Sequence, residues 1–585
     1  MTTSPMPTPE EPPTPTATTP EFGVYLASID VCGTSVSPPR GGVTAVVGGN
    51  NVGKSTMLRE LVNELARHPG LPSSAGIRLL RGLSLQTDGS VEDLRAWLYE
   101  NAHLVVGPQE GFVRLASNQP LPPNSLPHYW GQGDRMGPLS GFMVHYSTPM
   151  ARGGMVAPAP QRDNIGSPPI HPIHVLQDDA ELLKRVDEVS KEVFRQSLTL
   201  DRLSGNTFLR VGVPDKPAPP IDAITKQYRD ALAALPLLAD QGDGMKSLIG
   251  LLLPVIAATY PIVVIDEPEA FLHPPQAHQL GKTLATLARE RQIQVVLATH
   301  DRNLLAGLLA ADAPVSVIRL DRSGDATTAH SLAEDEVAGL WTDPVMRYSN
   351  VLDGLFHRVV VIAEADPDCR FYAAALDSLN AKQTLPIPPS EILFVPAGGK
   401  DGMAKIARSL RAVSVRVVAC PDLDILDDKT KIRRLVEVFG GDWSELERNY
   451  DVAVEPLKSK KVEATCGEVL KAVEVALSGQ HDEAWTEEKK VALRPALRTS
   501  QTEFKKLKRF GMATFAGQSA AAAEQLVAQL DALGICCVRE GELERLAPAL
   551  GVTKGPAWVG AALAAGAHED SQAIAQVQRM VDAAQ

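Results

Sequence analysis

Hydrophobic and polar positions follow the periods of strands and helices from about Phe22 onward. The stretch "GVYLASIDV" (23–31) alternates residue by residue, and "GVTAVVGG" (42–49) is a short apolar run, so both predict β-strands. Residues 236–320 then have the pattern helix, strand, helix, strand. This order predicts a parallel sheet covered by helices.

The longest apolar run is "SLIGLLLPVIAATYPIVVI" (247–265). Pro254 and Pro261 interrupt it, and charged residues flank it on both sides. A membrane-spanning helix needs a longer uninterrupted apolar stretch. We therefore predict a buried helix followed by a buried strand.

A second series of strands and helices begins at "HRVVVIAEA" (357–365) and ends with "SVRVVACPDLD" (414–424). From about residue 445 the pattern is mostly helical, with one late strand at "GICCVREG" (534–541). The expected fold class is α/β, with two successive α/β domains and a mostly helical C-terminal region. The expected parts are a disordered Pro/Thr-rich tail (1–21), a first domain (22–350) with an irregular insertion around 107–172, a second domain (351–445) and a helical region that completes it (446–585).

The composition of the chain argues against several classes of protein. The net charge of −13 over 585 residues argues against a generally basic nucleic-acid coat, although it leaves room for a local basic groove. The six cysteines form no CxxC pair and no zinc spacing, which fits a reducing compartment. The N-terminal segment lacks the basic and apolar regions of a signal peptide. We expect a cytoplasmic protein that does not enter a membrane.

A glycine-rich loop follows the second strand. "GGNNVGKS" (48–55) matches GxxxxGK[ST], and a helical stretch follows it directly. Glycines let backbone N–H groups approach phosphate oxygens, the lysine reaches the β- and γ-phosphates, and the serine hydroxyl is a Mg²⁺ ligand. The helix N-terminus adds a favourable dipole. The residues expected to bind ATP in this segment are Gly48, Asn51, Gly53, Lys54, Ser55 and Thr56.

Two further strand ends complete the expected ATP site. "YPIVVIDEPEAFLHP" places Asp266 and Glu267 after four apolar residues, and "IQVVLATHD" places His300 at the end of another strand. We expect Asp266 to bind Mg²⁺, Glu267 to orient or deprotonate water, and His300 to sense the γ-phosphate. The turn "QGDGMKS", with Gly242 and Gly244, precedes a long helix and is suited to binding the γ-phosphate of a second subunit.

This order of motifs resembles the ABC-type ATPase heads over roughly residues 22–325. It is most similar to the AAA-type subgroup found beside nucleases, including the OLD (overcoming lysogenisation defect) family. The turn "GDGMKS" departs from the transporter pattern LSGGQ, which disfavours a transporter motor. The absence of a long heptad stretch speaks against an SMC-like coiled-coil arm. The resemblance implies that two heads close over ATP, in a homodimer or tetramer.

Carboxylates cluster at two strand ends of the second series. "VVVIAEADPD" carries Glu364 and Asp368, and "VRVVACPDLD" carries Asp422 and Asp424. Parallel strands end at the same edge of a sheet, so these carboxylates are expected to converge. Like charges at such distances repel, and Mg²⁺ or Mn²⁺ with oxygen ligands would compensate them. The sequence therefore predicts a metal site that acts on phosphodiesters.

The two carboxylate motifs resemble a TOPRIM domain over about residues 355–445. The family pattern has glycine after the first glutamate, where this chain has Ala365. The resemblance to OLD proteins implies that a late acidic residue, Glu544 in "REGELERL", contributes to a second metal. Lys554 is the candidate cation near the scissile phosphate. The runs "KSKK" (458–461) and "KKLKR" (505–509) fit solvated charge or a DNA-backbone surface.

The expected protein is an ATP-hydrolysing, metal-dependent endonuclease acting on double-stranded DNA, with Glu267, His300 and the acidic cluster as its catalytic residues. By resemblance, its role would be defence against phage, and the need for a companion defence protein is left open. Two alternatives remain: a regulatory ATPase sensor with a non-cleaving TOPRIM domain, and a DNA-repair ATPase.

Overall fold

The computed structural model describes residues 22–342 and 350–585 apart from short gaps. The gaps are 72–77, 107–109, 116–119, 132, 163, 165–166, 168, 258–259, 325, 460, 464, 478–485, 487–488, 490–492, 494–499, 503, 548–549 and 551–555. The tail expected at 1–21 and the candidate residue Lys554 therefore lie outside the described residues.

The chain divides into two compact units, Met1–Ala338 and Gly339–Gln585. The sequence patterns predicted a boundary near residue 350. The helix α12 (Glu334–Thr342) contains the division between the units. Each unit is described by itself below.

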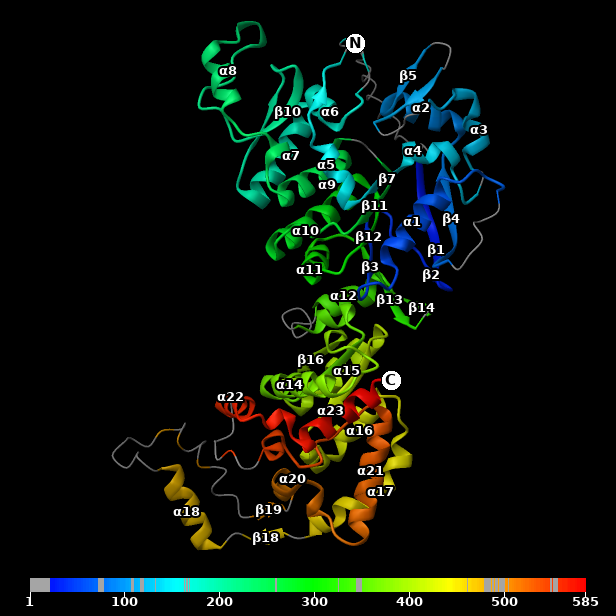
Figure 1. Ribbon diagram of the computed structural model, residues 1–585. Helices are drawn as coiled ribbons and strands as arrows, with labels where there is room; N and C mark the ends of the chain where they lie inside the picture. The colour runs from blue at the N-terminus through cyan, green and yellow to red at the C-terminus, as the bar shows by residue number, and fades with distance from the viewer. Residues whose placement is uncertain are drawn as a thin grey trace, which may run out of the picture. The chain divides into compact units, whose positions relative to one another are not determined.

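The first unit is built around a six-stranded sheet of order β14-β13-β3-β12-β11-β7 (Figure 1). All neighbouring strands are parallel except β13 and β14, which form an antiparallel pair. The strands are β3 (Val43–Val47), β7 (Val144–Ser147), β11 (Ile262–Asp266), β12 (Gln294–Ala298), β13 (Val315–Ser323) and β14 (Ala326–Leu332). The central strands are apolar and fully buried, as expected for a parallel sheet covered on both faces.

Helices cover both faces of this sheet. The helix α1 (Lys54–Leu65) packs against β11 and β12, while α10 (Pro274–Arg291) and α11 (Arg302–Ala310) lie together on the other side (Figure 1). Gly281 of α10 and Gly307 of α11 allow the two helix backbones to touch, because a Cβ at either position would overlap a carbonyl oxygen of the partner helix.

Smaller elements surround the central sheet. One antiparallel sheet has the order β2-β1-β4, another has the order β8-β10-β9, and β5 pairs with β6. The strands are β1 (Gly23–Val31), β2 (Thr34–Val36), β4 (Leu80–Asp88), β5 (His103–Val105), β6 (Gly111–Val113), β8 (Ala159–Pro160), β9 (Leu198–Asp201) and β10 (Asn206–Val211). The helices are α2 (Val91–Asn101), α3 (Leu126–Tyr129), α4 (Ser140–Met143), α5 (Pro149–Met155), α6 (Pro172–Asp178), α7 (Ala180–Phe194), α8 (Lys226–Ala233) and α9 (Asp243–Ala257).

The stretch expected to be an irregular insertion, 107–172, contains short elements and also part of the central sheet. Its segment Val144–Ser147 is β7, the edge strand beside β11. The helix α5 follows β7 directly and packs against α9. This part of the chain therefore helps to build the frame of the first unit.

The second unit contains a parallel sheet of order β16-β15-β17. The strands are β15 (Val359–Ala363), β16 (Ile392–Pro396) and β17 (Arg416–Cys420). The segment 534–541, expected to be a strand, is not a regular strand in the structure; it lies beside β17, where Ile535 and Val538 form isolated parallel bridges to Ala419 and Asp422. The sheet is thus extended on its β17 side by a segment more than a hundred residues further along the chain.

The helices of the second unit pack around this sheet. The helices α14 (Asp366–Lys382) and α23 (Ser571–Ala583) share a hydrophobic core with β15 and β17. The helix α15 (Lys400–Ala412) also contacts β15 and β17. The remaining elements are α16 (Lys429–Val438), α17 (Trp443–Ser459), β18 (Lys461–Glu463), α18 (Cys466–Ala476), β19 (Ser500–Thr502), α20 (Lys505–Phe510), α21 (Gln518–Leu533) and α22 (Pro556–Ala564).

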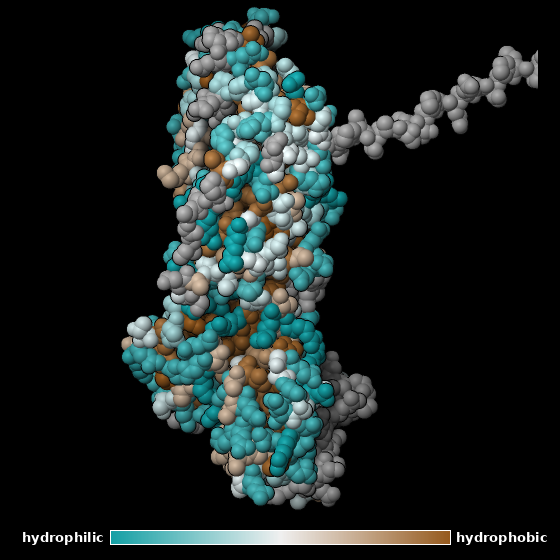
Figure 2. Space-filling model, turned by 90° about the vertical axis from the view of Figure 1, so that its right-hand side faces the viewer, coloured by the Kyte–Doolittle hydropathy of each residue, from teal (hydrophilic) through white to brown (hydrophobic). Residues whose placement is uncertain are grey.

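One face of the molecule illustrates how polar and apolar residues are distributed on the surface. On the face shown in Figure 2, hydrophilic residues cover most of each unit and hydrophobic residues form smaller groups. Such a mixture is normal for folded proteins. Within the described residues, we find no helix whose length and hydrophobicity would let it cross a membrane.

Gly541 is a point where two backbones touch, and it provides a test of the second unit. It has φ +114°, and a Cβ there would overlap the carbonyl oxygens of Leu507 and Lys508. We expect Gly541→Ala to lower the free energy of unfolding by about 2–4 kcal/mol, because both strain and overlap are introduced. Thermal unfolding measures the loss. The control is Gly560→Ala in α22, where a Cβ meets open space; an equal loss in both variants would contradict the prediction.

Candidate functional sites

The glycine-rich loop of the first unit joins β3 to α1. Gly48 has φ +143° and Gly53 has φ +105°, and a Cβ on Gly48 would overlap the carbonyl oxygen of Leu320. Asn51 also lies in the left-handed region, with φ +61°. These conformations curl the backbone in front of α1, whose first residues are Lys54, Ser55 and Thr56. The loop therefore has the shape that backbone amides need to surround phosphate oxygens.

Lys54 lies folded back on this loop. Its Nζ donates hydrogen bonds to the carbonyl oxygens of Gly48 at 2.9 Å and Gly49 at 2.7 Å. Burial lowers the pKa of the Lys54 ammonium, and the nearby Glu269, Glu267 and Asp266 oppose that shift. An ammonium group held beside the glycine-rich loop is suited to binding the β- and γ-phosphates of a nucleotide.

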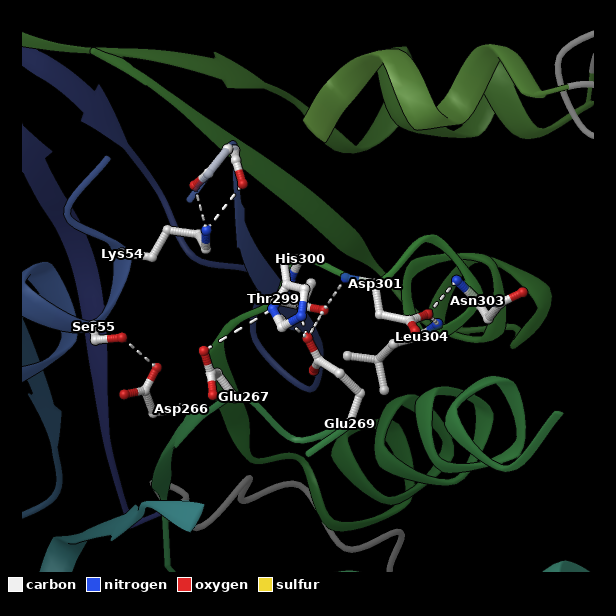
Figure 3. A network of polar contacts seen from close by, with 12 residues as sticks. Lys54, Ser55, Asp266, Glu267, Glu269, Thr299, His300, Asp301, Asn303 and Leu304 are labelled. Carbon is white, nitrogen blue, oxygen red and sulfur yellow. Dashed lines mark hydrogen bonds and ion pairs between the residues drawn. The ribbon is translucent and has the colours of Figure 1, made fainter. Parts of the chain in front are cut away.

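Ser55 and Asp266 meet although they lie in distant parts of the chain. The Ser55 hydroxyl donates to Asp266 Oδ1 at 2.9 Å (Figure 3). Asp266 is the last residue of β11, two strands away from β3 in the sheet. A hydroxyl and a carboxylate at this distance fit a shared Mg²⁺, which prefers oxygen ligands.

His300 lies between two glutamates at the end of β12. Its Nδ1 is 3.3 Å from Glu269 Oε1 and 4.0 Å from Glu267 Oε1 (Figure 3). Glu267 has φ +44°, so the backbone turns sharply where β11 ends. The expected residues Asp266, Glu267 and His300 are therefore brought to the same edge of the sheet as the glycine-rich loop.

Glu269 was not singled out from the sequence, although it belongs to the motif "DEPE". Its Oε1 accepts hydrogen bonds from the Thr299 hydroxyl at 2.8 Å and from the His300 backbone N–H at 3.0 Å. Burial raises the pKa of this carboxyl. Glu269 thus holds the chain around His300 and contacts its imidazole at the same time. The second glutamate of the motif was the signal that could have found it.

Arg152 is a second residue that the sequence did not reveal. It is 1% exposed and donates to the carbonyl oxygens of Asp266 at 2.5 Å and Glu267 at 2.9 Å. It also donates to the Ser247 hydroxyl on α9 at 3.1 Å. Burial lowers its pKa to about 10. Arg152 therefore fixes the end of β11 and ties it to α9.

The expected signature-like turn lies at the beginning of α9. Gly242 directly precedes the helix, and Gly244 lies in its first turn. A Cβ on Gly244 would lie 2.7 Å from the carbonyl oxygen of Phe271, which follows β11. The turn is thus packed against the loop after Asp266 and Glu267, and its role toward a second subunit stays a prediction.

The second unit gathers carboxylates at the ends of β15 and β17. One oxygen each of Glu364, Asp422 and Asp424 lies within 4.8 Å of the others. Glu364 Oε1 accepts a hydrogen bond from the Asp422 backbone N–H at 3.2 Å. Asp424 Oδ1 is buried without a hydrogen-bond partner among the described residues. An unsatisfied buried oxygen beside two further carboxylates fits a divalent cation.

Two lysines also reach this acidic cluster, and neither was assigned to it from the sequence. Lys400 Nζ lies 2.7 Å from Asp424 Oδ2, and Lys508 Nζ lies 3.2 Å from the same oxygen. Lys400 follows the glycine pair of "VPAGGKDG", which was a usable signal. Lys508 belongs to "KKLKR", a run interpreted as solvated charge or a DNA-backbone surface.

Asp368 and Glu544 lie next to the cluster. Asp368 is in the first turn of α14, where Oδ2 accepts a hydrogen bond from the Ala365 N–H at 3.0 Å. Burial raises its pKa to about 6, and the charges of Glu364 and Glu544 act in the same direction. Glu544 is therefore near enough to Asp368 to influence it, while its role as a ligand of a second metal stays a prediction.

The pKa of the Asp422 carboxyl is raised within the cluster. Burial, followed by the charges of Glu364, Asp368 and Asp424, raises its pKa from 3.8 to about 8. Burial also raises the pKa of Glu364, although Lys400 opposes it. The neighbouring carboxylates therefore disfavour the ionisation of Asp422, Glu364 and Asp368, which a bound cation would reverse.

The chain matches a family model described as "AAA domain, putative AbiEii toxin, Type IV TA system" over residues 110–306. The Old nuclease of Escherichia phage P2 is 25% identical over 173 residues, which are 28% of this chain and 28% of that protein. The OLD nuclease of Thermus scotoductus is 25% identical over 256 residues, 42% of this chain and 47% of that protein. The chain thus matches less than half the length of either relative.

Solved structures of ATPase heads are also similar to part of the chain. An SMC head bound to the C-winged helix domain of ScpA has a TM-score of 0.33 and 13% identity, covering 54% of this chain and 99% of that one. The SMC head domain of Thermotoga maritima has a TM-score of 0.26 and 13% identity, covering 53% and 98%. The strand order and the loop geometry described above carry the fold assignment.

The first unit is an α/β domain with a P-loop between β3 and α1, and the second is an α/β unit with an acidic edge. The resemblance to the OLD family, predicted from the motifs, is confirmed by the two curated relatives.

The raised pKa of Asp422 predicts how the stability of the second unit depends on pH. A carboxyl whose pKa is higher in the folded than in the unfolded chain costs stability as pH rises from the lower value to the higher one. In EDTA we expect the melting temperature to fall between pH 4 and about 8, the range set by the two pKa values. Asp422→Asn should flatten this fall, as measured by thermal unfolding across that range. The control Asp377→Asn, on the exposed face of α14, should not. Identical pH profiles for all three proteins would contradict the prediction.

Proposed function

We propose that this protein is an ATP-hydrolysing, divalent-metal-dependent DNA endonuclease of the OLD type, with a TOPRIM domain in its second unit. The observation that supports it most directly is the convergence of Glu364, Asp422 and Asp424 at the end of two parallel strands. The named relatives are nucleases, which supports the same reaction class. The TOPRIM assignment is favoured by the sheet order and by the placement of these carboxylates after β15 and β17.

The first unit would bind and hydrolyse ATP. Lys54 and the loop amides would hold the β- and γ-phosphates, and Ser55 with Asp266 would hold Mg²⁺. Glu267 would orient water, with His300 beside it at the γ-phosphate. Gly242 and Gly244 would face the nucleotide of a second copy, so ATP would promote dimers or tetramers.

The second unit would cut the phosphodiester. Glu364, Asp368, Asp422, Asp424 and Glu544 would hold Mg²⁺ or Mn²⁺. Divalent ions bound there would supply a nucleophile at neutral pH and charge stabilisation for the phosphate. Lys554 would add a cation near the scissile phosphate. A cytoplasmic location and a role in defence against phage follow from the family resemblance and belong to this proposal.

A regulatory ATPase sensor is the second candidate. The observation that favours it is that Lys400 and Lys508 already compensate the carboxylates in the protein itself. In that case the acidic edge would be a structural ion-pair network, and the ATPase head would carry the activity.

ATP binding and turnover can be separated by two variants. We expect Lys54→Ala to lose ATP binding, because the cation for the phosphates is removed. Glu267→Gln should keep binding and lose about 10²–10⁴-fold in turnover, the usual contribution of a general base. Binding of a fluorescent ATP analogue and release of phosphate measure the two effects. The control Glu181→Gln replaces an exposed glutamate on α7; full ATP binding by Lys54→Ala would contradict the assignment of this site.

A plasmid assay tests the nuclease and separates it from the sensor. Supercoiled DNA is incubated with the protein and Mg²⁺ or Mn²⁺, with and without ATP. We expect cleavage by the natural protein and at least about a hundredfold loss in Glu364→Ala and Asp422→Ala, because each removes a metal ligand. Asp377→Ala, an exposed position on α14, is the matched control. ATP turnover without cleavage under either metal would support the sensor instead.

A further inference from the structure

Lys508 is attached by its backbone to the loop that carries Asp422 and Asp424. The Leu423 N–H donates to the carbonyl oxygen of Gly541 at 2.9 Å. Gly541 in turn lies directly against the carbonyl oxygen of Lys508, since a Cβ there would be 2.5 Å away from it. This packing holds the backbone of Lys508 beside the cluster, while the place of its ammonium depends on the side-chain conformation.

The two lysines at the cluster differ in exposure. The Lys400 side chain is 15% exposed and lies 2.7 Å from Asp424 Oδ2. The Lys508 side chain is 40% exposed and spans two carboxylates, at 3.2 Å from Asp424 Oδ2 and 3.9 Å from Asp422 Oδ2. Although Asp422 and Asp424 are 8% and 9% exposed, the lysine end of the pair is open to solvent and its stem is flexible, so Lys508 can turn from them to another anion.

A divalent cation and the Lys508 ammonium would compete for the same carboxylates. Both are attracted to Asp422 and Asp424, and they repel each other at such short range. The cluster therefore favours one cation or the other beside these two carboxylates. When a divalent cation binds, the Lys508 ammonium must turn away while its backbone stays fixed beside the site.

The surroundings of Lys508 fit a polyanion. Lys505, Lys506 and Arg509 lie on the same short helix, α20, and are exposed. This concentrates positive charge in a chain of net charge −13. A lysine released from the carboxylates here would meet the backbone phosphates of a nucleic acid that reaches the metal site.

We propose that Lys508 exchanges partners: it pairs with Asp424 and Asp422 while the cluster holds no divalent cation, and with a nucleic-acid phosphate once the cluster holds one. This inference rests on the proposed metal site. It makes the binding of divalent cation and the binding of DNA mutually favourable, because each equilibrium shifts the other by the same factor.

The first measurement is Mn²⁺ binding to the full chain by calorimetry, without nucleotide and without DNA. We expect Lys508→Met to bind Mn²⁺ about two- to fivefold more tightly than the natural protein, since a competing ion pair is removed. Lys505→Met removes the same charge from the same helix and should leave the Mn²⁺ affinity unchanged. Asp422→Asn removes one carboxylate of the cluster, so the part of the calorimetric Mn²⁺ signal that this variant loses comes from binding at the cluster.

The second measurement is binding of a short fluorescent DNA duplex over a range of salt concentrations, with and without Mn²⁺; a denaturing gel confirms that the duplex is intact. The natural protein should bind DNA more tightly with Mn²⁺, and Lys508→Met should lose most of this gain. In the presence of Mn²⁺, DNA binding by Lys508→Met should also depend less steeply on salt concentration, by about one released ion. Lys505→Met should keep the gain from Mn²⁺.

The outcomes separate this inference from the proposed function. If Lys508→Met binds Mn²⁺ as the natural protein does or more weakly, or keeps the full effect of Mn²⁺ on DNA binding, the exchange of partners is wrong while the metal site stands. If Asp422→Asn and the natural protein show the same Mn²⁺ signal, the metal site itself is wrong, and the exchange falls with it.

Discussion

The ends of parallel strands determine where chemistry can take place in this protein. In both units, strands that run side by side finish at one edge, so residues far apart in sequence are delivered to the same place. In the first unit this places Ser55 beside Asp266 and His300 beside Glu267. In the second it places Glu364 beside Asp422 and Asp424. Polar groups at such an edge are close together and partly buried, so each must find a compensating partner.

The groups that compensate the buried polar atoms differ between the two sheet edges. In the first unit, fixed groups of the chain hold the strand ends: Arg152 donates to the carbonyl oxygens that follow β11, and Glu269 accepts from the segment around His300. These hydrogen bonds fix the backbone at the strand ends, although Glu269 Oε2 is also buried without a hydrogen-bond partner in the described chain. In the second unit, carboxylates outnumber the nearby lysines, and Asp424 keeps a buried oxygen without a partner in the described chain. That edge is suited to an additional cation.

The parts of the fold and of the sites that could be predicted from the sequence are those that depend on short local motifs. The glycine-rich loop and the strands ending at Asp266, Glu364 and Asp422 depend on short patterns, and they were predicted at the positions where the structure has them. Arg152 and Lys508 could not be predicted in the same way. The strand-end carbonyls that Arg152 binds and the carboxylates that Lys508 meets lie far away in the sequence, and an arginine or lysine in a sequence is usually solvated. The pairing of the late segment with β17 also depends on long-range packing, which hydrophobic periodicity does not encode.

The late segment beside β17 delays completion of the acidic edge until well after β17 itself has been synthesised. A nascent chain that has just passed β17 already contains Glu364, Asp422 and Asp424, but it lacks residues 534–541 and their hydrogen bonds to the loop carrying Asp422 and Asp424. It also lacks α23, which shares the hydrophobic core with α14 and β17. Contacts of such long sequence separation form late in folding. A partly made chain would thus have a folding ATPase head well before it had a finished acidic edge, so the order of synthesis delays the assembly of the more hazardous of the two proposed activities.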